Sequence, residues 1–158
     1  MPETAEATAN TPESAPAPNL EAEFQAQTQQ ATDPYFVDEN GLAIRGTDPV
    51  AYFTEGAAVP GRAEFSYRWG NATWQFSSAA HRDQFAANPE QYAPQYGGFC
   101  AWAVSQGYTA PIDPNAWRIV DGRLYLNFSP GVQRRWERNI PGNIAQANVN
   151  WPSVYEGQ

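Results

Sequence analysis

Hydrophobic and polar residues alternate in two stretches of the chain, and each stretch predicts a β-hairpin. The first covers residues 65–76, in which aromatic residues occupy every second position on either side of a Gly-Asn turn. The second covers residues 117–128 around Asp121-Gly122, a dipeptide typical of two-residue hairpin turns. Both stretches are therefore expected to form antiparallel strand pairs.

Capping residues and helix breakers predict short helices around these hairpins. The expected ranges are 50–55, 78–87, 99–105, a helix that opens at Ser129-Pro130, and a last turn or two within 143–150. No internal repeat is evident in the residues. We expect an α+β fold in which the two hairpins contribute to a small antiparallel sheet and the short helices pack around it.

Composition divides the chain into a tail and a domain. Residues 1–34 are rich in Ala, Pro, Glu and Gln and contain almost no large apolar side chain, so they cannot bury enough surface to offset the entropy of ordering. Six acidic residues lie there without a basic one, and they account for most of the net charge of −8. We interpret residues 1–34 as a disordered acidic tether and residues 35–158 as an aromatic-rich folded domain.

Charge and residue usage exclude several classes of function. All nine basic residues are Arg, so lysine Schiff-base and phosphate-loop chemistry are excluded. The acidic tail and the lack of an evident basic stripe argue against nucleic acid as a partner. No apolar run approaches the roughly 18 residues that a membrane-spanning helix requires. The chain also lacks the basic and apolar regions of a secretory signal.

Metal binding or catalysis would depend on His81 and Cys100, the only histidine and the only cysteine. If their helices pack together, an imidazole and a thiol could meet as metal ligands, with Asp83 or Asp48 as a third. A Cys-His nucleophilic pair is the catalytic alternative. A buried structural cysteine and a hydrogen-bonded structural histidine are the simpler interpretations of both residues.

Aromatic residues and glycines are dense between residues 92 and 108. The functional interpretation is an aromatic-walled pocket for a flat or apolar ligand, and the simpler one is a tightly packed core loop. The candidate pocket residues are Tyr96, Phe99, Trp102 and Tyr108.

Several of these segments together resemble the YHS domain, a small module associated with copper-handling ATPases and other metal-linked proteins. The resemblance lies in Asp48-Pro49-Val50, in Trp-Gln-Phe-Ser-Ser at 74–78, and in the helix that leads to Asn88-Pro89 and Tyr92. Residues 92–107, 117–127 and Pro-Gly-Asn-Ile from residue 141 are similar to the exported bacterial subgroup. The similarity covers roughly residues 40–152.

The resemblance implies a metal-linked function with a changed ligand set. Metal-linked YHS domains place cysteines at the positions that are Ala51, Ser77 and His81 here, whereas Cys100 belongs to the motif of the exported subgroup. The subgroup commonly carries an export signal, so the resemblance implies a periplasmic or otherwise exported protein, with a cytoplasmic one as the alternative. Residues 1–34 would then be the tether that follows the cleaved signal.

The leading hypothesis from the sequence is a non-enzymatic binding module for a soft transition metal such as Cu(I), or for a metal-containing ligand. Copper is the expected cofactor and the pair His81 and Cys100 the expected metal site, because thiolate and imidazole suit Cu(I). One alternative is a protein–protein interaction module whose metal site has decayed. The other is an enzyme that depends on Cys100.

Overall fold

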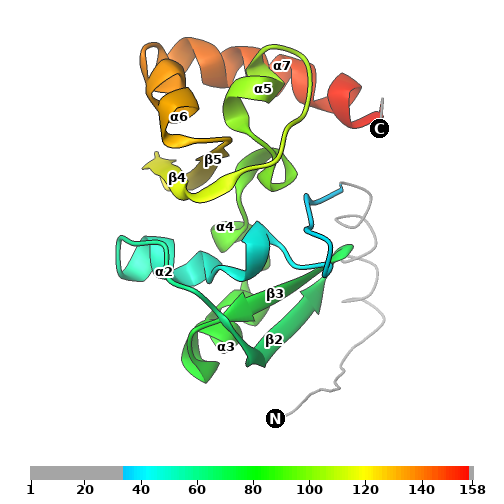
Figure 1. Ribbon diagram of the computed structural model, residues 1–158, viewed down its shortest axis with the longest axis vertical. Coiled ribbons are helices and arrows are strands. Elements are labelled where there is room, and N and C mark those ends of the chain that lie inside the picture. Colours follow the sequence, from blue (N-terminus) through cyan, green and yellow to red (C-terminus); the bar gives the residue numbers. More distant parts are fainter. Residues whose placement is uncertain (1–33, 157–158) are drawn as a thin grey trace. The chain divides into compact units, whose positions relative to one another are not determined.

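The computed structural model describes residues 34–156, which belong to one unit, Pro34–Gln158. The predicted tether lies outside the described residues except for Pro34. The described part has an α+β fold, which confirms the predicted fold class (Figure 1). Its elements in chain order are η1 (Ile44–Gly46), α2 (Pro49–Thr54), β2 (Arg62–Trp69), β3 (Ala72–Phe76), α3 (Ala79–Ala87), α4 (Pro89–Tyr92), η2 (Gln95–Gly98), α5 (Ala101–Ser105), β4 (Asp113–Val120), β5 (Arg123–Asn127), α6 (Pro130–Glu137) and α7 (Ile140–Glu156).

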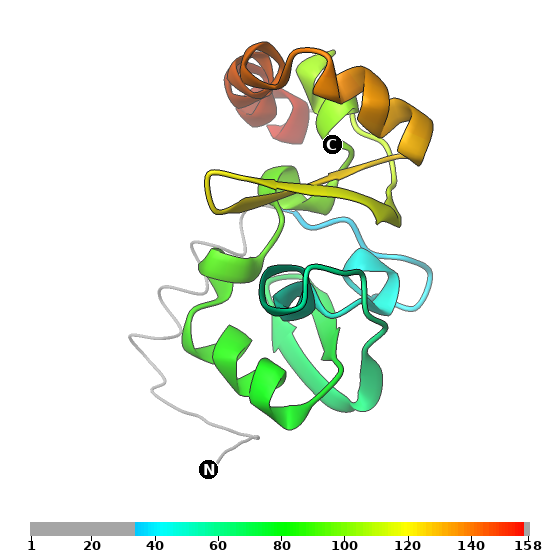
Figure 2. The same ribbon diagram turned by 90° about the vertical axis from the view of Figure 1, so that its left-hand side faces the viewer.

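Both predicted hairpins are present, and each forms a two-stranded antiparallel sheet of its own. In the first sheet Tyr67 pairs with Trp74, and in the second Arg118 pairs with Tyr125. The first strand of each hairpin contains a register irregularity, so it is longer than its partner. Figures 1 and 2 show the β2–β3 sheet on one side of α4 and the β4–β5 sheet on the other.

The two sheets belong to two halves of the domain that have the same architecture. Each half begins with three consecutive residues at positive φ, which are 44–46 in the first half and 96–98 in the second. A short helix, α2 or α5, follows, then a hairpin, and then a helix capped by a serine side chain, Ser78 or Ser129. The aromatic residues Phe85 and Trp136 occupy the same place in the serine-capped helix of each half, and both are fully buried.

Backbone hydrogen bonds repeat between the halves as well. The N–H of Asp48 donates to Val59 O at 2.9 Å, and the N–H of Cys100 donates to Ala110 O at 3.0 Å. Asp48 and Cys100 are the N-caps of α2 and α5, so they occupy equivalent positions. The described domain therefore contains the same helix–hairpin–helix arrangement twice, which we call the structural duplication.

This structural duplication was not expected, because no internal repeat is evident in the residues. Equivalent positions carry different side chains, such as Asp48 and Cys100 or His81 and Val132. What the halves share is backbone conformation, namely left-handed turns, caps and strand register, to which a search for similar residues is blind. The Ser caps, the turn residues at the hairpins and the buried aromatic residues Phe85 and Trp136 are among the equivalent positions that retain a related chemistry.

Two hydrophobic clusters form the core of the described domain, and one of them joins the halves. The larger one centres on Trp74, Phe76 and Phe85 of the first half and also contains Leu124 and Leu126 of the second. Tyr52 links the halves directly, because its ring lies 5.0 Å from that of Trp117 and its hydroxyl donates to Pro114 O at 2.6 Å. The second cluster lies within the second half and is covered by α7; its buried members are Tyr96, Ala101, Val104, Tyr125, Trp136 and Ala147.

Candidate functional site

A buried carboxylate organises the candidate site of the first half. Asp48 has no solvent exposure, and its Oδ1 accepts hydrogen bonds from Val50 N at 2.8 Å and Ala51 N at 3.2 Å, which caps α2. Its Oδ2 accepts from Ser77 N at 2.8 Å and from Ser77 Oγ at 2.7 Å. The sequence Asp-Pro at 48–49 sets this geometry, because Pro49 occupies the first turn, where its missing N–H costs no hydrogen bond.

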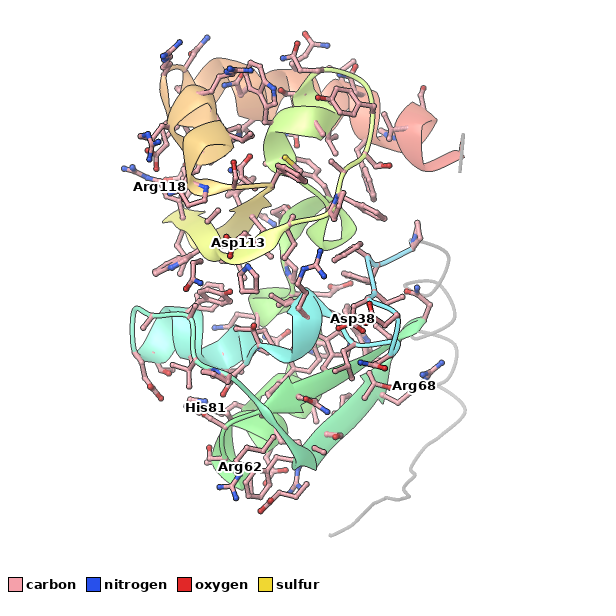
Figure 3. All side chains as sticks on the ribbon, viewed as in Figure 1. Asp38, Arg62, Arg68, His81, Asp113 and Arg118 are labelled. Carbon is pink, nitrogen blue, oxygen red and sulfur yellow. The ribbon has the colours of Figure 1, made fainter. Side chains whose placement is uncertain are left out.

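His81 is held against the same carboxylate oxygen. Its side chain projects from α3, which begins at Ser78, and its Nδ1 lies 2.7 Å from Asp48 Oδ2. Because the carboxylate can only accept, Nδ1 carries a proton, and the neutral imidazole has its lone pair on Nε2. The His81 side chain is 13% exposed, and Figure 3 shows it between α2 and α3.

The Nε2 atom of His81 faces the C-terminal end of α2. Thr54 Oγ1 lies 3.3 Å from it and Glu55 Oε2 lies 3.7 Å from it. Glu55 is the C-cap of this helix, whose last carbonyl groups carry partial negative charge. A neutral imidazole nitrogen, a carboxylate and a helix C-terminus together favour a cation at this place.

The order Thr54, His81 and Asp48 also matches the hydrogen-bond order of a nucleophile, a base and an orienting acid. An acyl-transfer site also requires N–H donors for an oxyanion. Thr54 lies in the last turn of α2, and its hydroxyl is also 3.3 Å from Val50 O, so carbonyl groups surround it. This surrounding repels an oxyanion, so the arrangement does not fit acyl transfer by Thr54.

Cys100, the other predicted metal ligand, contacts a different set of residues from His81. It caps α5 in the second half, where its Sγ accepts from Ala103 N at 3.5 Å and lies 3.6 Å from Asn127 Oδ1. The side chain is 1% exposed. Both views place α3, which carries His81, and α5, which follows Cys100, in different halves of the domain (Figures 1 and 2).

Burial raises the pKa of the Cys100 thiol above its ordinary value, and the N–H groups of Ala103, Phe128 and Trp102 lower it by a smaller amount. The thiol is therefore protonated at neutral pH, which suits neither a nucleophile nor a thiolate ligand. The structure supports the simpler interpretation of this cysteine, a small buried side chain that also caps a helix.

Three of the four candidate pocket residues pack into the second half of the domain, and the fourth lies at the surface. Tyr96 and Phe99 both lie 6.1 Å from the Trp151 ring, and Tyr96 also donates to Asn148 Oδ1 at 2.9 Å. The Trp102 ring lies under the Arg135 guanidinium at 5.7 Å, whereas Tyr108 is 52% exposed. Tyr96, Phe99 and Trp102 thus pack in the second hydrophobic cluster, which fits the interpretation of this segment as a tightly packed core loop.

Sequence reasoning named Asp48, Ser77 and His81 but missed Thr54 and Glu55. Asp83, the other carboxylate considered as a ligand, lies at the surface beside Arg82 at 3.1 Å. A signal for Glu55 was present, because Asp48-Pro49 fixes the start of α2 and Gly56 fixes its end. The residue before that glycine must then lie at the C-terminal end of a helix that is only six residues long.

No family model matches the chain, and neither a curated protein nor a solved structure matches it. The resemblance to the YHS domain therefore stays a prediction. Within residues 34–156, no helix is long and apolar enough to cross a membrane. No three His, Cys, Asp or Glu side chains in the described part of the chain are grouped closely enough to hold a metal ion.

Proposed function

We propose that the domain is a non-enzymatic binding module for a divalent transition-metal ion, which it holds through His81 Nε2 and the Glu55 carboxylate. The 2.7 Å contact between His81 Nδ1 and the buried Asp48 carboxylate carries this proposal. Histidines that bind metals commonly donate their other ring N–H to a carboxylate, which fixes the tautomer and makes the ligand nitrogen more basic. Asp48 does both for His81.

The donor atoms favour a divalent ion over Cu(I). Imidazole and carboxylate suit Zn²⁺ and Cu²⁺, whereas Cu(I) prefers the thiolate that Cys100 does not supply. The 3.7 Å between His81 Nε2 and Glu55 Oε2 can be spanned by two metal–ligand bonds of about 2.0–2.2 Å. Glu55 is half exposed, so its carboxylate can adjust to the ion.

The resemblance to the YHS domain supports a metal site beside Asp48. The three positions that carry cysteine in metal-linked YHS domains are Ala51, Ser77 and His81 here, and all three contact the Asp48 carboxylate. Since the described residues offer two ligands, water or a second protein would complete the coordination shell. A module that delivers or receives a metal fits this open arrangement. The exported location implied by the resemblance is part of the proposal.

The test is a titration of the untagged full chain with Zn²⁺ and Cu²⁺ by isothermal titration calorimetry, beside the variants His81→Ala and Glu55→Gln. We expect one-to-one binding that His81→Ala abolishes and Glu55→Gln weakens. Glu90→Gln is the matched control, because Glu90 is an exposed glutamate on α4 away from His81, and it should bind as the wild type does.

Two further variants separate this proposal from its alternatives. Cys100→Ser should leave divalent binding unchanged; a loss, together with tight Cu(I) binding by the wild type, would favour the His81 and Cys100 pair instead. Asp48→Asn should weaken binding about 10- to 100-fold through the orientation of His81, measured at a temperature where circular dichroism shows the fold intact. Binding that survives His81→Ala, or no binding at all, refutes the proposal.

A further inference from the structure

The arginines of the described domain are concentrated on one part of the second half. Five of the chain's nine arginines fall between residues 118 and 138, where only two acidic residues, Asp121 and Glu137, accompany them. The five are Arg118, Arg123, Arg134, Arg135 and Arg138, which lie on β4, β5, α6 and its C-cap. All five are exposed. The absence of a basic stripe expected from the sequence therefore does not hold for this region.

Strand register places Arg118 and Arg123 on a common side of the β4–β5 hairpin. Arg118 pairs with Tyr125, and Arg123 lies two residues from Tyr125 on the same strand, so all three share a face of the hairpin. The Tyr125 ring packs 5.4 Å from that of Trp136 on α6. Arg118 also reaches Glu137 at 3.3 Å, which confirms that the C-terminal end of α6 lies over this face. Figure 3 shows Arg118 at the edge of the domain beside α6.

The arginines of α6 continue this surface. Arg134 and Arg138 are four residues apart, which places them on one face of the helix turn. Arg135 lies over the Trp102 ring at 5.7 Å. We call the surface formed by these five residues the arginine face; it comprises Arg118, Arg123, Arg134, Arg135 and Arg138.

The arginine face is incompletely neutralised within the described residues. Arg123, Arg134 and Arg138 have no carboxylate partner between residues 34 and 156, and Arg118 has one, Glu137. In the first half, Arg62 and Arg82 each have a carboxylate partner, Glu64 and Asp83, whereas Arg45 and Arg68 donate to the neutral acceptors Ile112 O and Thr73 Oγ1. Among the described residues, four of the five arginines of the second half thus lack a carboxylate partner, against two of the four in the first half.

We propose that the arginine face binds an acidic peptide segment of a partner protein. Guanidinium groups match carboxylates in a planar, two-bond geometry, so a segment with several Asp or Glu residues satisfies the unpaired arginines. The face is short, since the eight residues of α6 extend only about 12 Å. A few carboxylates therefore suffice, whereas a long polyanion such as nucleic acid would also meet the repulsion of a chain with net charge −8. The inference does not depend on the proposed metal site.

The test uses a fluorescein-labelled peptide of alternating Glu and Gly residues, and fluorescence anisotropy at low ionic strength. We expect saturable binding that weakens as salt is raised, because the interacting charges are exposed. The double variant Arg134→Gln/Arg138→Gln should bind about tenfold more weakly. Arg62→Gln/Arg68→Gln is the matched control: it removes the same charge from the first half and should bind within a factor of two or so of wild type.

Several outcomes would overturn this proposal. Equal losses in both double variants would show that net charge alone drives binding, and no binding at low salt would refute the surface directly. A peptide of Gln and Gly that binds as well would exclude a role for carboxylates. Tighter binding of single-stranded DNA of similar length would make the face a nucleic-acid site instead. The variants alter exposed side chains only, and circular dichroism checks that both fold.

Discussion

Asp48→Asn is the substitution that tests the architecture of the candidate site most directly. Asparagine has the size of aspartate and is itself a good N-cap, so the change removes charge and one acceptor without creating a cavity. In the native site, Oδ1 faces two backbone N–H groups of α2, and Oδ2 faces Ser77 N, Ser77 Oγ and His81 Nδ1. Every neighbour is a donor, so the new NH₂ group meets donors whichever way the amide is oriented.

The expected cost is about 3 kcal/mol of unfolding free energy. Hydrogen bonds to a charged group contribute about 1.5–3 kcal/mol, and a buried donor left without an acceptor costs about 1–3 kcal/mol. These terms are not additive here, because Ser77 Oγ can rotate and His81 can move its proton from Nδ1 to Nε2. The Ser77 N–H is fixed by the backbone and cannot turn to another acceptor, so the cost of leaving it unpaired remains in any case.

Urea unfolding followed by tryptophan fluorescence measures this cost, with Asp83→Asn as the control. Asp83 is exposed on α3, and its substitution should change the unfolding free energy by less than about 0.5 kcal/mol. Nitrogen chemical shifts of the imidazole provide a second readout, since the variant should shift neutral His81 toward the tautomer protonated at Nε2. A cost below about 1 kcal/mol with an unchanged tautomer would show that Asp48 does not organise this site.

Four further predictions concern packing and ionisation. Gly61→Ala should destabilise the domain by about 2 kcal/mol or more, because a Cβ there would lie 2.5 Å from the backbone carbon of Gln75; a near-neutral urea midpoint would refute the close approach. Gly131→Ala should instead stabilise it by about 0.5–1 kcal/mol, since a Cβ in this first turn of α6 meets only ordinary contacts, and a lower midpoint would contradict this. Native Cys100 should react with iodoacetamide far more slowly than in urea, and equal rates by mass spectrometry would show an accessible thiol. Burial raises the pKa of Tyr52 and of Cys100, so their protonated forms stabilise the folded state, and this stabilisation is complete below the pKa values of the unfolded chain. The unfolding free energy should therefore fall as pH rises above about 9. An unfolding free energy that stays constant up to about pH 11 would contradict this prediction.

Local features of the fold could be predicted from the sequence because short-range chemistry determines them. The Asp-Gly turn, the alternating strands and the Ser and Asp caps require only neighbouring residues, and the structure has all of them. The division into two sheets and the duplication depend on contacts between distant segments, such as Tyr52 with Trp117, which alternation along the chain does not specify.

Some residues of the candidate site could also be predicted from the sequence, but the contacts between them could not. Asp48 and His81 were both identified from the sequence as possible metal ligands. Their contact required the packing of α3 against α2, which brings together residues 33 positions apart. The expected meeting of His81 with Cys100 rested on the assumption that consecutive helices pack together. The duplication instead places Cys100 at the position of a second Asp48, in the other half.

The equivalence of Asp48 and Cys100 leads to a last prediction, about how each half caps its first helix. In the first half one carboxylate oxygen accepts from both Val50 N and Ala51 N. In the second half Cys100 Sγ accepts from Ala103 N at 3.5 Å, and Trp102 N donates to Asn127 Oδ1 at 3.0 Å. The task of one aspartate is thus shared between a thiol and a buried amide.

This arrangement leaves the side-chain N–H groups of the buried Asn127 without a hydrogen-bond acceptor among the described residues, which lowers the stability of the domain. Asn127 has no solvent exposure, and the unpaired atom is its Nδ2. Asn127→Leu removes that unpaired donor but leaves Trp102 N without an acceptor, so we expect a loss of about 1–3 kcal/mol. Cys100→Asp alone places a carboxylate beside the Asn127 oxygen, which repels it, and should also destabilise the domain.

Together the two substitutions should cost less than the sum of their separate effects. In Cys100→Asp/Asn127→Leu the new carboxylate can accept from Trp102 N and Ala103 N, as Asp48 does for α2, and no amide oxygen opposes it. A double-mutant cycle by urea unfolding should then give a favourable coupling of about 1 kcal/mol or more. A matched double-mutant cycle between Asp48 and Phe76, the equivalent of Asn127 in the first half, should show no such coupling, because the Phe76 side chain supplies no hydrogen bond. Additive costs at Cys100 and Asn127 would mean that the halves share a backbone path but not a capping chemistry.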